Sequence, residues 1–223
     1  MTPQEPQLLA GLDIACRFFY QAFHHAPIQP FLQLMKDEQL LEDWPLPTES
    51  DKVSEGIKLL MSCLEQGAEP SINAMTEDFA DLFIGPNALK AAPWASVYLS
   101  EEQTTCGEAT LGIKAFYREF GVEIDTGENE PEDHIGLIFA FLAHLTGQAL
   151  ENIEREEAAQ PWLCASRSFL TDHVLTWVPR FLEILREQAQ TDFYRGISLL
   201  AEGTLQQFAE LVDAEYKIVR LYR

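Results

Sequence analysis

The chain has 223 residues, of which 47% are hydrophobic and 23% are charged, which is typical of one large globular domain. This composition excludes a disordered chain, a collagen-like fibre and a small scaffold held by disulfides. Its 15 basic and 36 acidic residues give a formal net charge of −21, which disfavours nucleic acids and anionic membrane surfaces and favours a cationic partner.

Apolar residues recur at spacings of three and four along nearly the whole chain, and almost nowhere alternate as in a strand. We predict helices at about residues 8–23, 31–41, 48–64, 71–83, 101–120, 131–145, 150–175, 179–190 and 193–212. Thr48 is expected to cap the third helix, Pro131 to lie in the first turn of the sixth, and Gly147 to interrupt or end it. The pattern predicts one all-α domain over residues 1–223, a helical bundle of about nine helices.

Two loops interrupt the helical pattern. The first, bracketed by Gly85-Pro86-Asn87 and Pro93-Trp94, is about a dozen residues long, a length that suggests a functional role. The second covers residues 122–130 and is acidic, and residues 121–160 contain ten acidic residues and one basic residue. Such a patch would attract a pair of guanidinium groups.

The start of the chain and its cysteines predict a cytoplasmic protein. The first residues lack the basic start and long apolar run of a secretory signal. The longest apolar stretch, residues 135–143, is too short to span a bilayer, so no membrane insertion is expected. Four cysteines lie more than 40 positions apart without a C-x-x-C pair, which indicates reduced thiols.

No motif for a metal, a cofactor or catalysis stands out. Five histidines occur without a ligand spacing such as H-E-x-x-H, and His24 and His25 are expected to point to different faces of their helix. A G-x-S-x-G elbow, a P-loop and a dinucleotide fingerprint are all missing. We therefore expect no cofactor, no metal and no enzymatic activity. The enzymatic alternative is a hydrolase that uses His134 and Asp133 as an acid–base pair.

Residues 129–134 and 81–99 each allow two interpretations. In the structural one, residues 129–134 supply a helix cap, a proline in the first turn and acids that complement the helix dipole. In the functional one, His134 joins a carboxylate cluster to a buried helix and is oriented by Asp133 or Glu130. The two aromatic residues of 81–99 either cover the core or, if exposed, form an apolar groove beside the acidic patch. Groove and patch together suit a peptide with an apolar helix and basic residues at one end.

These segments resemble the twin-arginine signal-peptide chaperones that mature molybdenum reductases, the TorD/DmsD/NarJ group. The main carriers of the resemblance are Glu130-Pro131-Glu132-Asp133-His134, which fits the family's E-P-x-D-H signature, and Leu82-Phe83-x-Gly85-Pro86. Further matching segments are Trp44-Pro45-Leu46-Pro47, Pro93-Trp94-x-Ser96-Val97-Tyr98-Leu99, Arg180-Phe181-Leu182 and Phe193-Tyr194-Arg195. They favour the DmsD branch, and the resemblance runs from about Leu12 to the last residue.

The resemblance implies a non-enzymatic, all-helical cytoplasmic protein. Such proteins bind the N-terminal signal of a dimethyl sulfoxide reductase-like catalytic subunit and delay its export until its cofactor is loaded. The family's signal-binding residues carry over to Phe79, Leu82, Phe83, Pro93, Trp94, Tyr98, Gly107, Glu130, Asp133 and His134. Phe79, Asn87 and Tyr98 stand where close relatives often have tryptophan, so the signal sequence that is recognised could differ.

From this resemblance we expect Asp133 and Glu130 to meet the two arginines, with His134 orienting them. Trp94, Leu82 and Phe83 would line the apolar groove. The twin-arginine translocase is a further candidate partner, and a general assembly adaptor is the alternative function. The client reductase, binding of a nucleotide or molybdenum cofactor, and the choice between a monomer and a dimer that swaps helices about residues 122–130 all stay open.

Overall fold

The computed structural model describes residues 5–66, 69–85, 88–124 and 130–223. Within these ranges the chain forms ten α-helices and no β-strand, which confirms the all-α prediction. The helices are α1 Glu5–His24, α2 Gln29–Asp37, α3 Asp51–Gln66, α4 Glu69–Phe79, α5 Ala95–Leu99, α6 Glu108–Glu119, α7 Ile135–Glu154, α8 Gln160–Phe169, α9 Val178–Gln188 and α10 Asp192–Val212. Two π-helical turns, η1 (Ala80–Ile84) and η2 (Leu170–Val174), continue α4 and α8.

Some helix ends differ from the prediction. The helix α3 begins at Asp51, so Thr48 lies outside it and does not cap it. The helix α7 begins at Ile135, not at Pro131, and it runs through Gly147 to Glu154. One glycine costs a helix interior only about 1 kcal/mol. The extensive packing of α7 against α1 outweighs that cost.

Left-handed residues other than glycine explain two further differences. Gln103 and Cys106 have φ angles of 50° and 63°, so residues 101–107 are not helical and α6 begins only at Glu108. Glu156, with a φ of 59°, follows the end of α7, and the predicted helix over residues 150–175 is therefore divided between α7 and α8. Side chains other than glycine rarely adopt this conformation, so the residue types at Gln103, Cys106 and Glu156 did not indicate these breaks.

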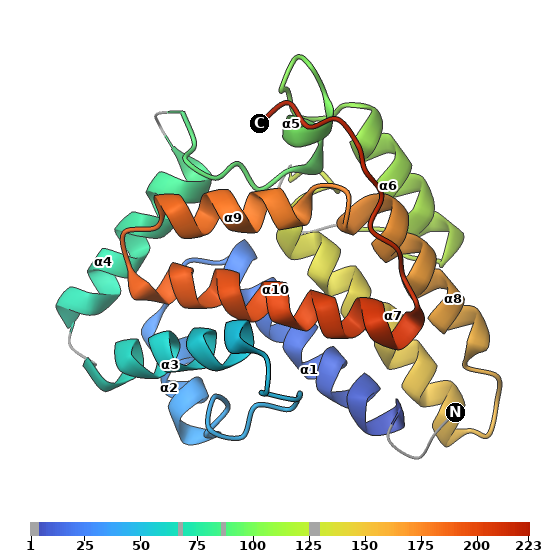
Figure 1. The fold of residues 1–223 in the computed structure, drawn as a ribbon, viewed down its shortest axis with the longest axis horizontal. Coiled ribbons are helices and arrows are strands. Elements are labelled where there is room, and N and C mark those ends of the chain that lie inside the picture. The colour runs from blue at the N-terminus through green and yellow to red at the C-terminus, as the bar shows by residue number, and fades with distance from the viewer. Residues whose placement is uncertain (1–4, 67–68, 86–87, 125–129) are drawn as a thin grey trace.

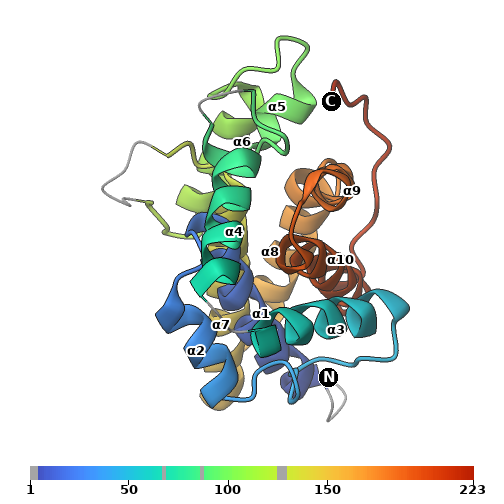
Figure 2. The same cartoon turned by 90° about the vertical axis from the view of Figure 1, so that its left-hand side faces the viewer.

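Two helix pairs build the centre of the fold. The helix α7 packs along α1, and α10 lies between α3 and α9, in front of that pair in the view of Figure 1 (also Figure 2). The helix α7 is apolar on most of its circumference, which is typical of a helix buried on all sides. At Gly203 of α10, an added Cβ would lie 2.4 Å from a methyl carbon of Val53 of α3, so only glycine permits this approach. The main apolar core runs from Leu12 to Val212.

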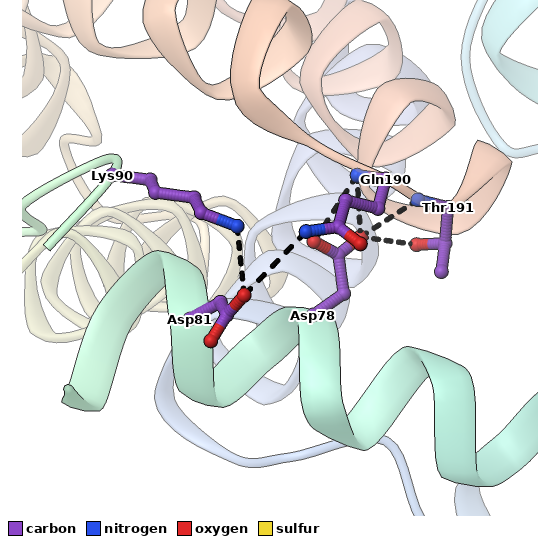
Figure 3. Close-up of polar contacts among 5 residues, drawn as sticks. All are labelled: Asp78, Asp81, Lys90, Gln190 and Thr191. Carbon is purple, nitrogen blue, oxygen red and sulfur yellow. Dashed lines mark hydrogen bonds and ion pairs between the residues drawn. The ribbon is translucent and has the colours of Figure 1, made fainter. Parts of the chain in front are cut away.

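A buried carboxylate ties α4 to the turn between α9 and α10 (Figure 3). Asp78 is buried, and it accepts hydrogen bonds from the backbone N–H of Gln190 at 3.1 Å and of Thr191 at 2.8 Å, and from the Thr191 hydroxyl at 2.6 Å. One turn later, Asp81 forms an ion pair with Lys90 at 2.7 Å. These bonds fix η1 and hold the loop that leads to Trp94 against it.

The residues after α10 form an extended segment that ends beside α5 (Figure 1). Lys217 forms an ion pair with Asp172 of η2, and the N–H of Tyr222 donates to the carbonyl of Tyr98 at 3.0 Å. None of the helices in the described ranges combines the length and the apolarity needed to cross a membrane.

Candidate functional site

The two segments singled out from the sequence lie side by side. Residues around Trp94 and His134 form a short antiparallel bridge. The N–H of Ile135 donates to the carbonyl of Pro93 at 2.8 Å, and the N–H of Ala95 donates to the carbonyl of Asp133 at 3.2 Å. The bridge joins the start of α5 to the start of α7, so it brings the aromatic loop and the E-P-x-D-H segment into one site.

Asp133 lies inside this junction. Its side chain is 0% exposed, and Oδ2 accepts a hydrogen bond from the backbone N–H of Ser96 at 2.8 Å. Its Oδ1 has no hydrogen-bond partner among the described residues. The carboxylate therefore holds the first turn of α5 in place. It does not lie at the surface, where we expected it to meet an arginine.

His134 is the N-cap of α7, and its Nδ1 accepts the N–H of Gly136 at 3.0 Å. Burial, and then the nearby His24 and His25, lower its pKa to about 3, so the ring is neutral at physiological pH. The ring is oriented by a backbone N–H, not by Asp133 or Glu130 as predicted. Pro131 precedes the helix, and its carbonyl accepts the N–H of His134 at 3.1 Å. The hydrogen bonds of His134 and Asp133 go to backbone groups, and this arrangement does not make them an acid–base pair.

Trp94 and Glu130 form the part of the site nearer to solvent. The indole Nε1 of Trp94 donates to Oε1 of Glu130 at 2.6 Å, and both side chains are half-buried. The indole ring lies 6.0 Å from the ring of His134, centroid to centroid. A carboxylate held beside an indole presents a negative charge next to an apolar surface.

Glu132 has a separate role. Burial opposes its ionisation. The hydrogen bond from Lys114, a backbone hydrogen bond and the positive charges of Lys114 and Arg118 outweigh burial and lower the pKa of Glu132. Its carbonyl also accepts the hydroxyl of Tyr117 at 3.1 Å. The three acids of the signature thus face different surroundings: Glu130 the indole, Glu132 a lysine of α6, and Asp133 the interior.

The apolar residues predicted for the groove lie mostly in the core. Leu82 is 0% exposed and Phe83 is 4% exposed, and the ring of Phe83 packs 5.2 Å from Phe79. Tyr98 is also buried, with its ring 5.3 Å from Trp177. These aromatic side chains do not form the wall of an open groove, because rings of α9 and α10 pack against them: Phe181 against Phe83 and Tyr98, and Tyr194 against Phe79 and Phe83.

The remaining predicted positions have simpler surroundings. Pro93 is buried and contributes its carbonyl to the bridge, and Gly107 is the N-cap residue of α6, where an added Cβ would lie 3.6 Å from that of Ser96. Pro86 and Asn87 of the first loop and Asn129 of the second lie outside the described residues.

The end of α1 also lies at this site, a contact that the sequence did not indicate. The ring of His24 lies 5.2 Å from His134 and 4.8 Å from His25. Our expectation that His24 and His25 point apart was wrong, because α1 ends at His24 and the chain turns there. The signal was Pro27, which ends the helix close to the histidine pair. Among the described residues, no group of three or more histidine, cysteine or acidic side chains is placed to hold a metal.

Comparison with known proteins identifies the family. The model of the nitrate reductase delta subunit family matches residues 47–183. The chain belongs to this family. A probable Tat proofreading chaperone DmsD of Haemophilus influenzae is 32% identical over 205 residues, which cover 92% of this chain and 91% of the relative. The Tat proofreading chaperone DmsD of Salmonella typhi is 31% identical over 92% of this chain and 90% of its own.

A chaperone protein TorD of Vibrio cholerae is 30% identical over 86% of this chain and 81% of its own length. The family match and these relatives together confirm the resemblance to the TorD/DmsD/NarJ group and to its DmsD branch. The named relatives are chaperones, and the chain aligns with them over most of their length.

Proposed function

We propose that this family member is a non-enzymatic cytoplasmic chaperone for a dimethyl sulfoxide reductase-like molybdoenzyme. It binds the twin-arginine signal peptide of the catalytic subunit and supports maturation of that subunit before export. The observation that carries the proposal is the half-buried pair of Trp94 and Glu130, hydrogen-bonded at 2.6 Å beside the E-P-x-D-H segment. The names of the DmsD and TorD relatives support the same function.

Glu130 suits an arginine. A carboxylate has about four acceptor positions, and the forked N–H groups of a guanidinium are a strong, geometrically matched partner for its two oxygens. Such a charge-assisted pair is stronger than a neutral hydrogen bond and fixes the register of the peptide. The net charge of −21 adds a long-range attraction for a basic peptide.

The apolar part of the peptide needs an apolar contact. Trp94 supplies one ring. In this proposal two large exposed apolar side chains add to it: Ile84, 66% exposed at the end of η1, and Ile28, 52% exposed four residues after α1. Burial of apolar area contributes roughly 25 cal/mol per Å², before the cost of ordering the peptide. In this proposal the buried Leu82 and Phe83 anchor η1, which carries Ile84, and Asp133 and His134 fix the backbone on either side of Trp94.

Titration calorimetry tests this function. The ligand is a synthetic signal peptide of dimethyl sulfoxide reductase type, compared with one whose two arginines are lysines. Micromolar or tighter binding that weakens on Arg→Lys substitution supports the proposal, since lysine keeps the charge but loses the planar fork. Equal binding of both peptides would favour a general assembly adaptor. Absence of binding would remove the signal peptide as the partner.

A further inference from the structure

A row of five rings extends from Trp94 across His134 onto α1. Ring centroids lie 6.0 Å apart from Trp94 to His134 and 5.2 Å from His134 to His24. The row ends in a cluster, in which the ring of His24 lies 4.8 Å from His25 and 5.2 Å from Tyr20, and His25 lies 5.6 Å from Tyr20. We call these five side chains the ring row. His25 is exposed and Tyr20 is half-buried, so the outer end of the ring row can be reached from solvent.

The position of the ring row is fixed by a close helix contact. An added Cβ at Gly136, in the first turn of α7, would lie 2.8 Å from the Cβ of His24 and 3.2 Å from its backbone nitrogen. Only glycine therefore lets the last turn of α1 approach the first turn of α7 this closely. The contact places His24 and His25 beside His134, and through His134 beside the pair of Trp94 and Glu130.

The electrostatics of this end of α1 favour a cation. The helix is 20 residues long, and the C-terminal end of its dipole carries a partial negative charge within the last turn. The buried ring of His134, whose pKa is lowered to about 3, adds no positive charge at the centre of the row. Glu130 lies at the other end, next to Trp94.

We propose that the ring row binds one arginine of the paired-arginine peptide, by stacking of its guanidinium on Tyr20 and His25, while Glu130 binds the other. The inference rests on the proposed function and adds the end of α1 to the binding surface. A guanidinium is planar and weakly hydrated, so it stacks on ring faces better than an ammonium does. The two arginines are thus held by different chemistry, one by a carboxylate and one by rings.

The test uses the full chain with two changes at the outer end of the row, Tyr20→Leu and His25→Ala, together. The probes are the peptide with paired arginines and the peptide with paired lysines. We expect the double variant to bind the arginine peptide about five- to tenfold more weakly and the lysine peptide nearly as well as the unchanged chain does. Tyr20→Phe, which keeps the ring, should retain the affinity.

The matched control is Ile14→Ala, which removes an exposed side chain of the same helix six residues before Tyr20. It should leave both affinities unchanged, and thermal unfolding of each variant checks the fold. If the double variant is folded and keeps the full preference for arginine, the ring row has no role in recognition. If the unchanged chain itself shows no preference for arginine, the proposed function fails together with this inference.

Discussion

The most informative prediction separates two of the three acids of the signature, Glu130 and Asp133. Glu130→Gln removes a charge at the edge of the site but keeps an oxygen that can accept the indole N–H of Trp94. Asp133→Asn removes the charge of a residue that is 0% exposed but keeps an oxygen that can accept the N–H of Ser96. Because the two substitutions are of similar size and chemistry, they report where the peptide arginines lie.

The expected magnitudes differ. A carboxylate and a guanidinium about 4 Å apart near a protein surface attract by roughly 1–4 kcal/mol before desolvation. We expect Glu130→Gln to weaken peptide binding by about 1–2 kcal/mol, which is about five- to thirtyfold. Asp133→Asn exchanges a charge-assisted hydrogen bond for a neutral one, so it should reduce the free energy of unfolding by about 1 kcal/mol and change peptide affinity less than threefold.

The dependence of peptide affinity on salt concentration should also distinguish Glu130→Gln from Asp133→Asn. Salt screens an exposed ion pair, so the slope of affinity against salt should flatten in Glu130→Gln and stay unchanged in Asp133→Asn. Calorimetry at four or five salt concentrations gives both slopes, and urea unfolding gives both stabilities. An equal flattening in both variants would refute the assignment of Asp133 to the interior of the site.

Three other outcomes follow from the contacts. Trp94→Ala should weaken peptide binding about tenfold or more, with only a small fall in the melting temperature, because the side chain is half-buried; a large loss of stability would instead make Trp94 a core residue. The lowered pKa of His134 means that the unfolded chain binds one more proton between about pH 6.5 and pH 3, so stability from this group is complete above pH 6.5 and is lost as the pH falls. From pH 7 to pH 5.5 the loss should be about 1 kcal/mol in urea unfolding, and His134→Asn, which keeps a capping side chain, should remove it. Asp78→Ala leaves two backbone N–H groups without their acceptor and should cost about 2–4 kcal/mol, whereas Asp81→Ala, at an exposed ion pair, should cost less than 1 kcal/mol. Equal costs would contradict the role of Asp78 as the acceptor that ties α4 to the turn between α9 and α10.

Helical spacing was a good guide to this fold because the apolar stripes of α1, α3 and α10 each face one continuous core. It was a poor guide to helix ends at Gln103 and Glu156, which take left-handed conformations that their side chains do not signal. It also misplaced the start of α7. Pro131 and the acids around it are suited to a first helical turn, but His134 caps the helix instead.

The site was predicted in part. The sequence identified the two segments that meet at the bridge of Trp94 and His134, because their residue types are unusual together. It could not indicate that Asp133 lies beneath the surface, since a carboxylate next to exposed acids looks the same in sequence whether it binds a ligand or a backbone N–H. It also could not indicate that His24 lies beside His134, because that contact depends on how closely α1 approaches α7, and these helices are distant in sequence.

The bridge between Trp94 and His134 has a consequence for the assembly of the site during folding. It closes a loop of about 40 residues, and loop closure of this length costs roughly 3 kcal/mol of chain entropy. A peptide that contacts both segments at once stabilises the state in which the bridge is formed. Hydrogen exchange at the amides of Ala95 and Ile135, which form the bridge, should therefore slow when the peptide is bound.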